Sequence, residues 1–178
     1  MNGIIVYKSK YGATKKYADW IAERTGFTCV RLEDTDVKKL MEYDVIIFGG
    51  GIYASGIAGL PFLKKNIVKL REKRIIVFCC GASPFEKGAF DAIVERNFKD
   101  DLEGLPCYYC RGVFDMHGMT FKDRTLCKML RKAVSKKNPN EYEVWEKGLM
   151  EARDDERADW TDISYIDPIV EEVSSEVK

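Results

Sequence analysis

The sequence predicts an α/β fold in which a doubly wound sheet of five parallel strands is followed by a helical extension. Short apolar runs alternate with amphipathic helical patterns along the first two thirds of the chain. Three of these runs are almost continuously apolar, which is typical of strands that helices cover on both faces. Because the connections are short, the alternation implies parallel strands joined by right-handed crossovers.

Five apolar runs are expected to form the sheet. They cover residues 3–8, 27–32, 44–49, 74–80 and 107–113. The second run has mixed polarity, which favours a position at the edge of the sheet. We therefore expect the strand order 2-1-3-4-5, one of the two common doubly wound arrangements.

Helical patterns fill the intervals between these runs. They cover residues 14–24, 36–43, 61–71 and 86–98. Gly26 is expected to end the first helix, Asp36 to cap the second and Pro61 to begin the third.

The pattern changes after the fifth strand. Residues 119–137 predict one long helix, and residues 161–177 predict a last helix with Asp167 as a candidate N-cap before Pro168. We expect residues 1–178 to form a single domain, with residues 114–160 packed on it as an extension. The long helix is expected to collect its apolar side chains on one face, namely Leu126, Met129, Leu130, Ala133 and Val134.

Composition excludes several classes of function. The chain has 29 basic and 29 acidic side chains, so no basic excess suggests nucleic-acid binding. No apolar run approaches the roughly 20 residues that span a bilayer, and the first residues do not resemble a signal peptide. The cytoplasm is therefore the expected compartment. The single histidine, His117, is too isolated for a metal site. It is expected to be either a solvated loop residue or a proton donor.

The six cysteines are expected to be reduced thiols, most of them buried. The spacing of Cys107 and Cys110 also occurs in metal and redox pairs. Residues three apart on a strand point to opposite faces, however, so we expect two separate buried thiols there.

The loop after the first strand has the composition of an anion site. It consists of Ser9, Lys10, Tyr11, Gly12, Ala13 and Thr14. Ser9 and Thr14 offer hydroxyl donors, Gly12 permits a tight turn, and the helix that follows directs free N–H groups at the loop. An ordinary strand–helix connection explains the same residues equally well, and Lys10 could simply extend into solvent.

Two glycine-containing segments follow later strands. Residues 49–56 begin with three glycines that allow close approach to a flat ligand, and Tyr53 offers a ring for stacking. The alternative is a flexible turn with a surface tyrosine. Residues 81–85 offer the N–H groups of Gly81 and Ala82. In an open parallel sheet, such segments meet outside the carboxyl ends of the strands, where ligands bind.

Together the three segments resemble those of the flavodoxin family, and the resemblance covers about residues 1–113. It implies a flavodoxin-like fold and an FMN cofactor, with residues 9–14 around the phosphate. It also implies that the other two segments line the two sides of the flavin ring, through Gly50, Gly51, Ile52, Tyr53, Ala54, Gly81, Ala82 and Ser83.

The extension is similar to that of the flavodoxin-like protoporphyrinogen oxidases, through residues 159–162 that lead into the last helix. The resemblance implies an FMN-dependent, quinone-linked enzyme of haem synthesis. Residues 51–56 depart from that family, whose second loop commonly carries a basic residue beside the tyrosine. The main alternative is an electron carrier that docks other redox proteins, although such carriers are strongly acidic and this chain has a pI near 6.6.

Charge in the extension is divided between two segments. Residues 122–137 carry a net charge of +6, and residues 141–162 carry −6. The basic helix could contact anionic lipid, which would place residues 119–137 on a membrane surface, or the propionates of a porphyrin. The favoured alternative is that the acidic segment folds back on it. Because the fifth strand ends beside the ligand loops, we expect residues 114–160 to form part of a substrate or quinone site.

Overall fold

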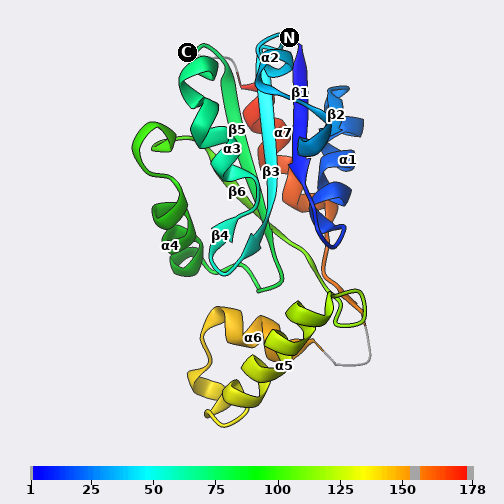
Figure 1. Ribbon diagram of the computed structural model, residues 1–178, viewed down its shortest axis with the longest axis vertical. Helices are drawn as coiled ribbons and strands as arrows, with labels where there is room; N and C mark the ends of the chain where they lie inside the picture. The colour runs from blue at the N-terminus through cyan, green and yellow to red at the C-terminus, as the bar shows by residue number, and fades with distance from the viewer. Residues whose placement is uncertain (1, 153–156, 176–178) are drawn as a thin grey trace.

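The structure, a computed structural model, describes residues 2–152 and 157–175 and contains the expected parallel sheet (Figure 1). Its strands are β1 (Gly3–Lys8), β2 (Thr28–Arg31), β3 (Val45–Tyr53), β5 (Arg74–Gly81) and β6 (Cys107–Arg111). They follow the order β2-β1-β3-β5-β6, and all neighbours are parallel. The expected order 2-1-3-4-5 is confirmed, because the additional short strand β4 (Gly56–Ile57) only folds back on the end of β3.

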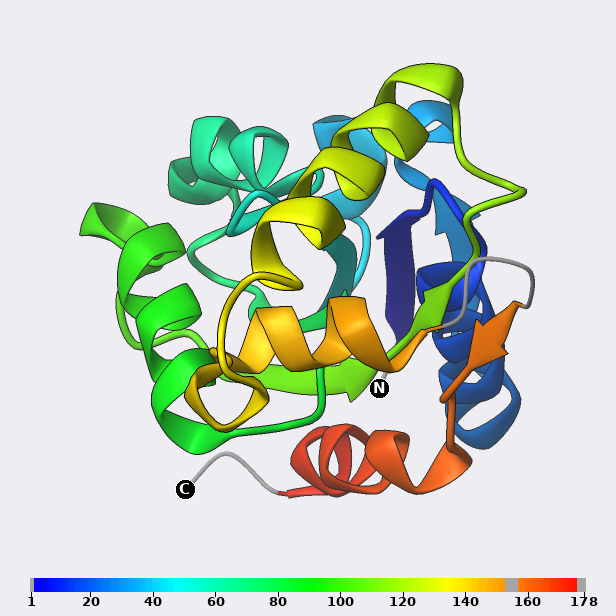
Figure 2. The ribbon, with the colours of Figure 1, turned by 90° about the horizontal axis from the view of Figure 1, so that it is seen from below.

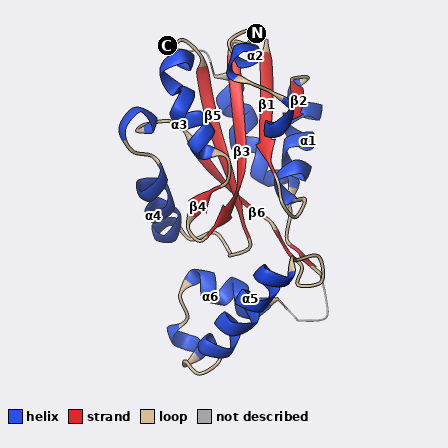
Figure 3. Cartoon of the chain, in the orientation of Figure 1, coloured by secondary structure: helices blue, strands red, loops and turns tan. Residues whose placement is uncertain are grey.

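Helices cover both faces of this sheet (Figures 1 and 3). One face is covered by α1 (Ala13–Thr25) and α7 (Asp167–Ser174), the other by α2 (Val37–Leu40), α3 (Leu60–Asn66) and α4 (Lys87–Asn97). Alternate residues of each strand enter the two cores. Cys107 packs against the α3 side and Cys110 lies in the α1 side, so the two thiols point to opposite faces, as expected.

Glycine and aspartate end or begin helices where the sequence predicts. Gly26 ends α1 with a φ of 72°, and the Asp36 carboxylate accepts a hydrogen bond from the Lys39 N–H at the start of α2. The Glu86 carboxylate caps α4 in the same way. Short 3-10 turns complete the connections at Leu32–Asp34, Asp100–Leu102 and Pro139–Glu141.

Two predicted helices are wrong in detail. The helix expected over residues 61–71 stops at Asn66 and tightens into a 3-10 turn, Ile67–Leu70. Asp167 is the first residue of α7 and not its cap, because the chain is already helical in the preceding 3-10 turn, Ile163–Ile166. An N-cap needs extended backbone, which Asp162 supplies one turn earlier. The expected end of the last helix at residue 177 lies outside the described residues.

Past β6 the chain forms two helices beyond the carboxyl ends of the strands (Figures 1 and 2). The strands β7 (Val113–Phe114) and β8 (Ala158–Asp159) pair as an antiparallel ribbon. Between them lie α5 (Phe121–Val134), shorter than the helix expected over 119–137, and α6 (Val144–Glu151). We call residues 115–152 the helical lobe. A small core joins it to the ribbon, and consists of Phe114, Met116, Val134, Leu149 and Ala152.

The apolar face predicted for α5 is mostly exposed. Val134 is buried, but Met129 is 65% exposed and Leu126 and Leu130 are also exposed. The helix is rotated because Arg131 turns inward and its guanidinium donates two hydrogen bonds to the Leu149 carbonyl near the end of α6. No helix among the described residues is long and apolar enough to cross a membrane.

The acidic segment divides its charges between the basic segment, residues 122–137, and the main domain. Lys137 pairs with the buried Glu146 and holds the pKa of that carboxyl below its usual range. Glu151 instead pairs with Arg111, and Asp159 with Lys16. The favoured expectation, that acids pair with the basic helix, therefore describes only part of the segment.

Candidate functional site

Three chain segments meet at the carboxyl edge of the sheet, facing the helical lobe (Figure 1). They follow β1, end β3 and follow β5, which are adjacent in the sheet. We call them the first, second and third segments, residues 9–14, 49–56 and 81–85. Their side chains can therefore act on one ligand, as the topology predicts.

The first segment has the geometry of an anion site. Gly12 caps α1 with a φ of 96°, and its N–H donates to the Ser9 hydroxyl at 3.1 Å. A methyl group at Gly12 would meet nothing within 4 Å, so the backbone conformation and not a lack of space requires glycine. The first N–H groups of α1 have no partners within the helix and point toward this segment. Thr14, in that first turn, is only 3% exposed.

The second segment is mostly strand, which corrects its description as a glycine loop. β3 continues to Tyr53, so its glycines belong to the ladder. A Cβ at Gly49 would lie 2.2 Å from the Phe78 ring, and one at Gly50 would lie 2.3 Å from the Ala58 carbonyl oxygen. Those two glycines serve close packing. The turn itself is made by residues with left-handed backbone, Ala54 and Ser55.

An acidic residue from the helical lobe joins the first segment. Asp123 of α5 accepts hydrogen bonds from the Lys10 ammonium and the Tyr11 hydroxyl. The hydrogen bond from Lys10 holds the pKa of this carboxyl below its usual range. Lys10 therefore does not simply extend into solvent. No local pattern in the sequence points to Asp123, because it lies 113 residues from Lys10.

Tyr53 connects the first and second segments. Its ring centroid lies 6.3 Å from that of Tyr11, and the Lys10 nitrogen lies 5.9 Å from it. Its side chain is 40% exposed, yet burial raises the pKa of its phenol to about 12. An accessible aromatic face thus stands at this edge of the sheet.

The third segment is held by β6 and by the helical lobe. The Tyr109 hydroxyl donates to the Ser83 carbonyl at 2.5 Å, and the Arg111 guanidinium donates to the Ala82 carbonyl at 3.3 Å. Across from it, a Cβ at Gly148 of α6 would lie 2.8 Å from the Ser83 Cα. The helix therefore packs directly on the backbone of this segment.

A cavity of about 1060 Å³ lies between the second and third segments, α4 and the lobe. Its inner wall includes Ile52, Gly81 and Tyr109, and its outer wall includes Phe85 of the third segment and Trp145 of α6. Phe85 is 53% exposed and Trp145 is 44% exposed. The cavity is large enough for a flat organic ring together with a second small molecule.

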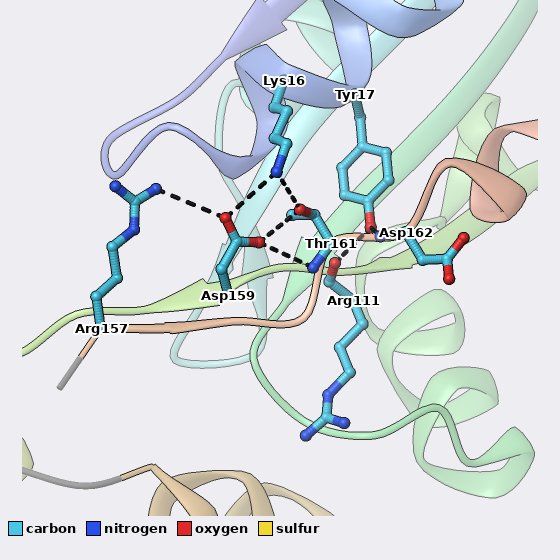
Figure 4. Close-up of polar contacts among 7 residues, drawn as sticks. All are labelled: Lys16, Tyr17, Arg111, Arg157, Asp159, Thr161 and Asp162. Atoms are coloured by element: carbon cyan, nitrogen blue, oxygen red, sulfur yellow. Dashed lines mark hydrogen bonds and ion pairs between the residues drawn. The ribbon is translucent and has the colours of Figure 1, made fainter.

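Polar contacts fasten the return from the lobe to α1 (Figure 4). The Lys16 ammonium donates to the Thr161 hydroxyl at 2.6 Å and pairs with Asp159. The Tyr17 hydroxyl donates to the Arg111 carbonyl at 2.5 Å and accepts the Asp162 N–H at 3.1 Å. The segment 159–162, which the sequence singled out, therefore anchors the lobe beside the first segment.

The three predicted segments thus occupy one edge, with the glycine turn and helix N-terminus of the first segment at one end and a cavity at the other. Within residues 2–152 and 157–175, no group of three His, Cys, Asp or Glu side chains is arranged to hold a metal ion. The arrangement fits an organic ligand that carries a phosphate and an aromatic ring.

Comparison with known proteins gives a family and several structural neighbours. A family model described as a flavodoxin domain matches residues 4–142. No curated protein matches the chain. The two-electron reduced flavodoxin of Megasphaera elsdenii is 25% identical, over 60% of this chain and 82% of that one, with a TM-score of 0.45. An archaeal flavodoxin is 20% identical, over 73% and 93%, with a TM-score of 0.42. Flavodoxin 1 of Bacillus cereus is 16% identical, over 73% and 94%, with a TM-score of 0.39.

Proposed function

Because the chain belongs to the flavodoxin domain family and FMN is its cofactor, we propose that it is an oxidoreductase that moves electrons between a small organic substrate and an acceptor. The flavin supplies the redox chemistry, and the protein supplies binding, orientation and electrostatics. The residues proposed to hold the phosphate are Ser9, Lys10, Tyr11, Gly12, Ala13 and Thr14. Those proposed to flank the ring are Gly50, Gly51, Ile52, Tyr53, Ala54, Gly81, Ala82 and Ser83.

The donor set of the first segment supports FMN in particular. A monophosphate needs hydroxyls, N–H groups and a helix N-terminus, all of which residues 9–14 and α1 offer. The dinucleotide fingerprint that would accommodate a pyrophosphate is missing from this loop. The exposed face of Tyr53, beside Tyr11, supports ring stacking next to the first segment.

The choice of an enzyme over a carrier rests on one observation. The cavity that includes the proposed ring site extends as far as α6 of the helical lobe. A carrier exchanges electrons at an exposed flavin edge and needs no such space. Exposed aromatic side chains on the cavity wall, Phe85 and Trp145, suit a flat apolar substrate. Protoporphyrinogen, with a quinone as acceptor, is one such substrate to test. The second candidate, a carrier that docks other redox proteins, is supported by the family alone.

A steady-state assay separates these functions. With protoporphyrinogen as donor and a menaquinone analogue as acceptor, an enzyme of this kind is expected to give saturable turnover that depends on bound FMN. The same assay with a panel of other reduced aromatic donors tests substrates other than protoporphyrinogen. Electron exchange with protein partners alone, and with none of the small donors, would support the carrier.

FMN binding through the first segment is tested by replacing Thr14 with valine. Loss of one hydrogen bond to a charged phosphate costs at least about 1.5 kcal/mol, so the dissociation constant is expected to rise about tenfold. Quenching of FMN fluorescence measures it, and chromatography of the extracted flavin checks for FAD. The matched control is Thr25→Val at the other end of α1, where the hydroxyl donates to the Ile21 carbonyl. An equal effect of both variants would place the phosphate elsewhere.

The outward face of α5 supports peripheral contact with an anionic membrane on the cytoplasmic side. Phe121 is 85% exposed and Met129 is 65% exposed, in a helix that also carries Lys122, Lys128 and Lys132. We expect the protein to float with phosphatidylglycerol vesicles but not with phosphatidylcholine vesicles, and Met129→Asp to abolish flotation. Val68→Asp, at an exposed apolar site on the main domain, is the control. Equal flotation of wild type and Met129→Asp would contradict this contact.

A further inference from the structure

The first turn of α5 lies against the first segment and is joined to it by one side chain. Asp123 accepts hydrogen bonds from two consecutive residues of that segment, the Lys10 ammonium and the Tyr11 hydroxyl. The position of Asp123 is fixed within its own helix, because its N–H donates to the Thr120 hydroxyl that caps α5. Its side chain is nevertheless 31% exposed, and that of Lys10 is 44% exposed.

The connection before α5 forms one unit with this first turn. The Arg124 guanidinium donates to the carbonyls of Met116, His117 and Met119, at 2.8, 2.6 and 3.1 Å. The Asp115 carboxylate accepts the N–H groups of His117 and Gly118. These contacts are internal to residues 115–124, so a movement of this unit as a whole would not break them.

The rest of the lobe is fastened to the main domain at other places. α6 packs on the third segment through Gly148, and Glu151 pairs with Arg111. The returning chain is held to α1 by Lys16. In the part of the chain that the structure describes, Asp123 supplies the polar contacts between the first turn of α5 and the first segment.

We propose that the first turn of α5 is a gate over the phosphate end of the cofactor site and that Asp123 is its latch. The inference rests on the proposed placement of the FMN phosphate in residues 9–14. Lys10 and Tyr11 belong to the segment proposed to hold that phosphate and also bind Asp123, so the latch lies across the phosphate end of the site. An exposed ion pair holds weakly, which suits a contact that must open for FMN to pass.

A gate and a simple repulsive charge predict different kinetics. A latch that blocks the path slows both association and dissociation of FMN, so its removal raises both rates and changes the dissociation constant little. A carboxylate that only repels the phosphate slows association and speeds dissociation. Its removal would then raise one rate and lower the other. The two roles of Asp123 are therefore distinguishable without any measurement of turnover.

The test uses Asp123→Asn in the full-length protein. Association is followed by quenching of FMN fluorescence, and dissociation by chasing bound radiolabelled FMN with excess unlabelled FMN. Both rates are expected to rise roughly fivefold, as loss of an exposed pair predicts, with the dissociation constant within about twofold of wild type. Tyr11→Phe removes one of the two latch bonds and also a proposed phosphate donor, so it is expected to raise the dissociation rate more than the association rate and to weaken binding. Lys122→Gln, at the neighbouring residue of α5, is the control.

Opposite changes in the two rates, or unchanged rates in both variants, would overturn the gate. Failure of the proposed function has a separate signature. If Thr14→Val leaves FMN affinity unchanged, the phosphate lies elsewhere, whatever Asp123→Asn does. If Thr14→Val weakens FMN binding while Asp123→Asn leaves both rates unchanged, the proposed phosphate site is supported and the gating role of Asp123 is contradicted.

Discussion

Replacing Gly12 with valine is expected to weaken FMN binding by about two decades. Gly12 has a φ of 96° at the start of α1, a conformation that β-branched residues avoid. Holding valine there costs up to about 3 kcal/mol, which is a factor of about 100 in affinity when the loop must take this shape around the phosphate. Titration of FMN fluorescence measures the loss of affinity. Thermal unfolding of the flavin-free protein measures the loss of stability.

Gly26 offers an unusually close control for this experiment. It lies at the other end of the same helix, has a φ of 72°, and likewise has no atom within 4 Å of the position that a Cβ would take. Gly26→Val therefore imposes a similar backbone cost on stability without touching the site. If Gly26→Val weakens FMN binding as much as Gly12→Val does, general loss of stability and not loop geometry is responsible.

Much of the fold follows from local patterns in the sequence. Continuous apolar runs identify β1, β3 and β5 because both faces of these strands are buried. The mixed polarity of β2 places it at the edge, and this alone separates the strand order from its alternatives. Caps such as Gly26 and Asp36 are predictable because they depend on residues within one turn.

Long-range contacts explain what the sequence could not predict. The glycines of β3 suggest a flexible loop, but they are required by the Phe78 ring and the Ala58 carbonyl, which lie on other segments. On the buried side of α5, Arg131 donates two hydrogen bonds to the Leu149 carbonyl of α6, so the periodicity of the apolar side chains did not reveal which face of the helix is buried. Asp123 reaches the site only through the folding of the lobe.

The role of the lobe in the site is tested most directly at Gly148. Glycine inside a helix costs about 0.5–1 kcal/mol relative to alanine, so its place in the middle of α6 needs a reason. The structure supplies one, because a Cβ would lie 2.8 Å from the Ser83 Cα and 3.1 Å from the Ser83 nitrogen. These are backbone atoms, so α6 or the third segment must move when a side chain is added.

Gly148→Val is therefore expected to separate α6 from the third segment and to open the outer wall of the cavity. Overpacking of this kind costs about 1–3 kcal/mol, and if that cost falls on the substrate complex, KM rises roughly tenfold to a hundredfold. The visible absorbance of bound FMN is expected to shift, because Ser83 adjoins the proposed ring site. The affinity for FMN is expected to change less, because the residues proposed to hold the phosphate are not altered. Ala133→Val also introduces a valine into a helix, at an exposed position of α5, and is the control. Unchanged FMN absorbance and KM in Gly148→Val, with normal folding, would show that the lobe takes no part in the site.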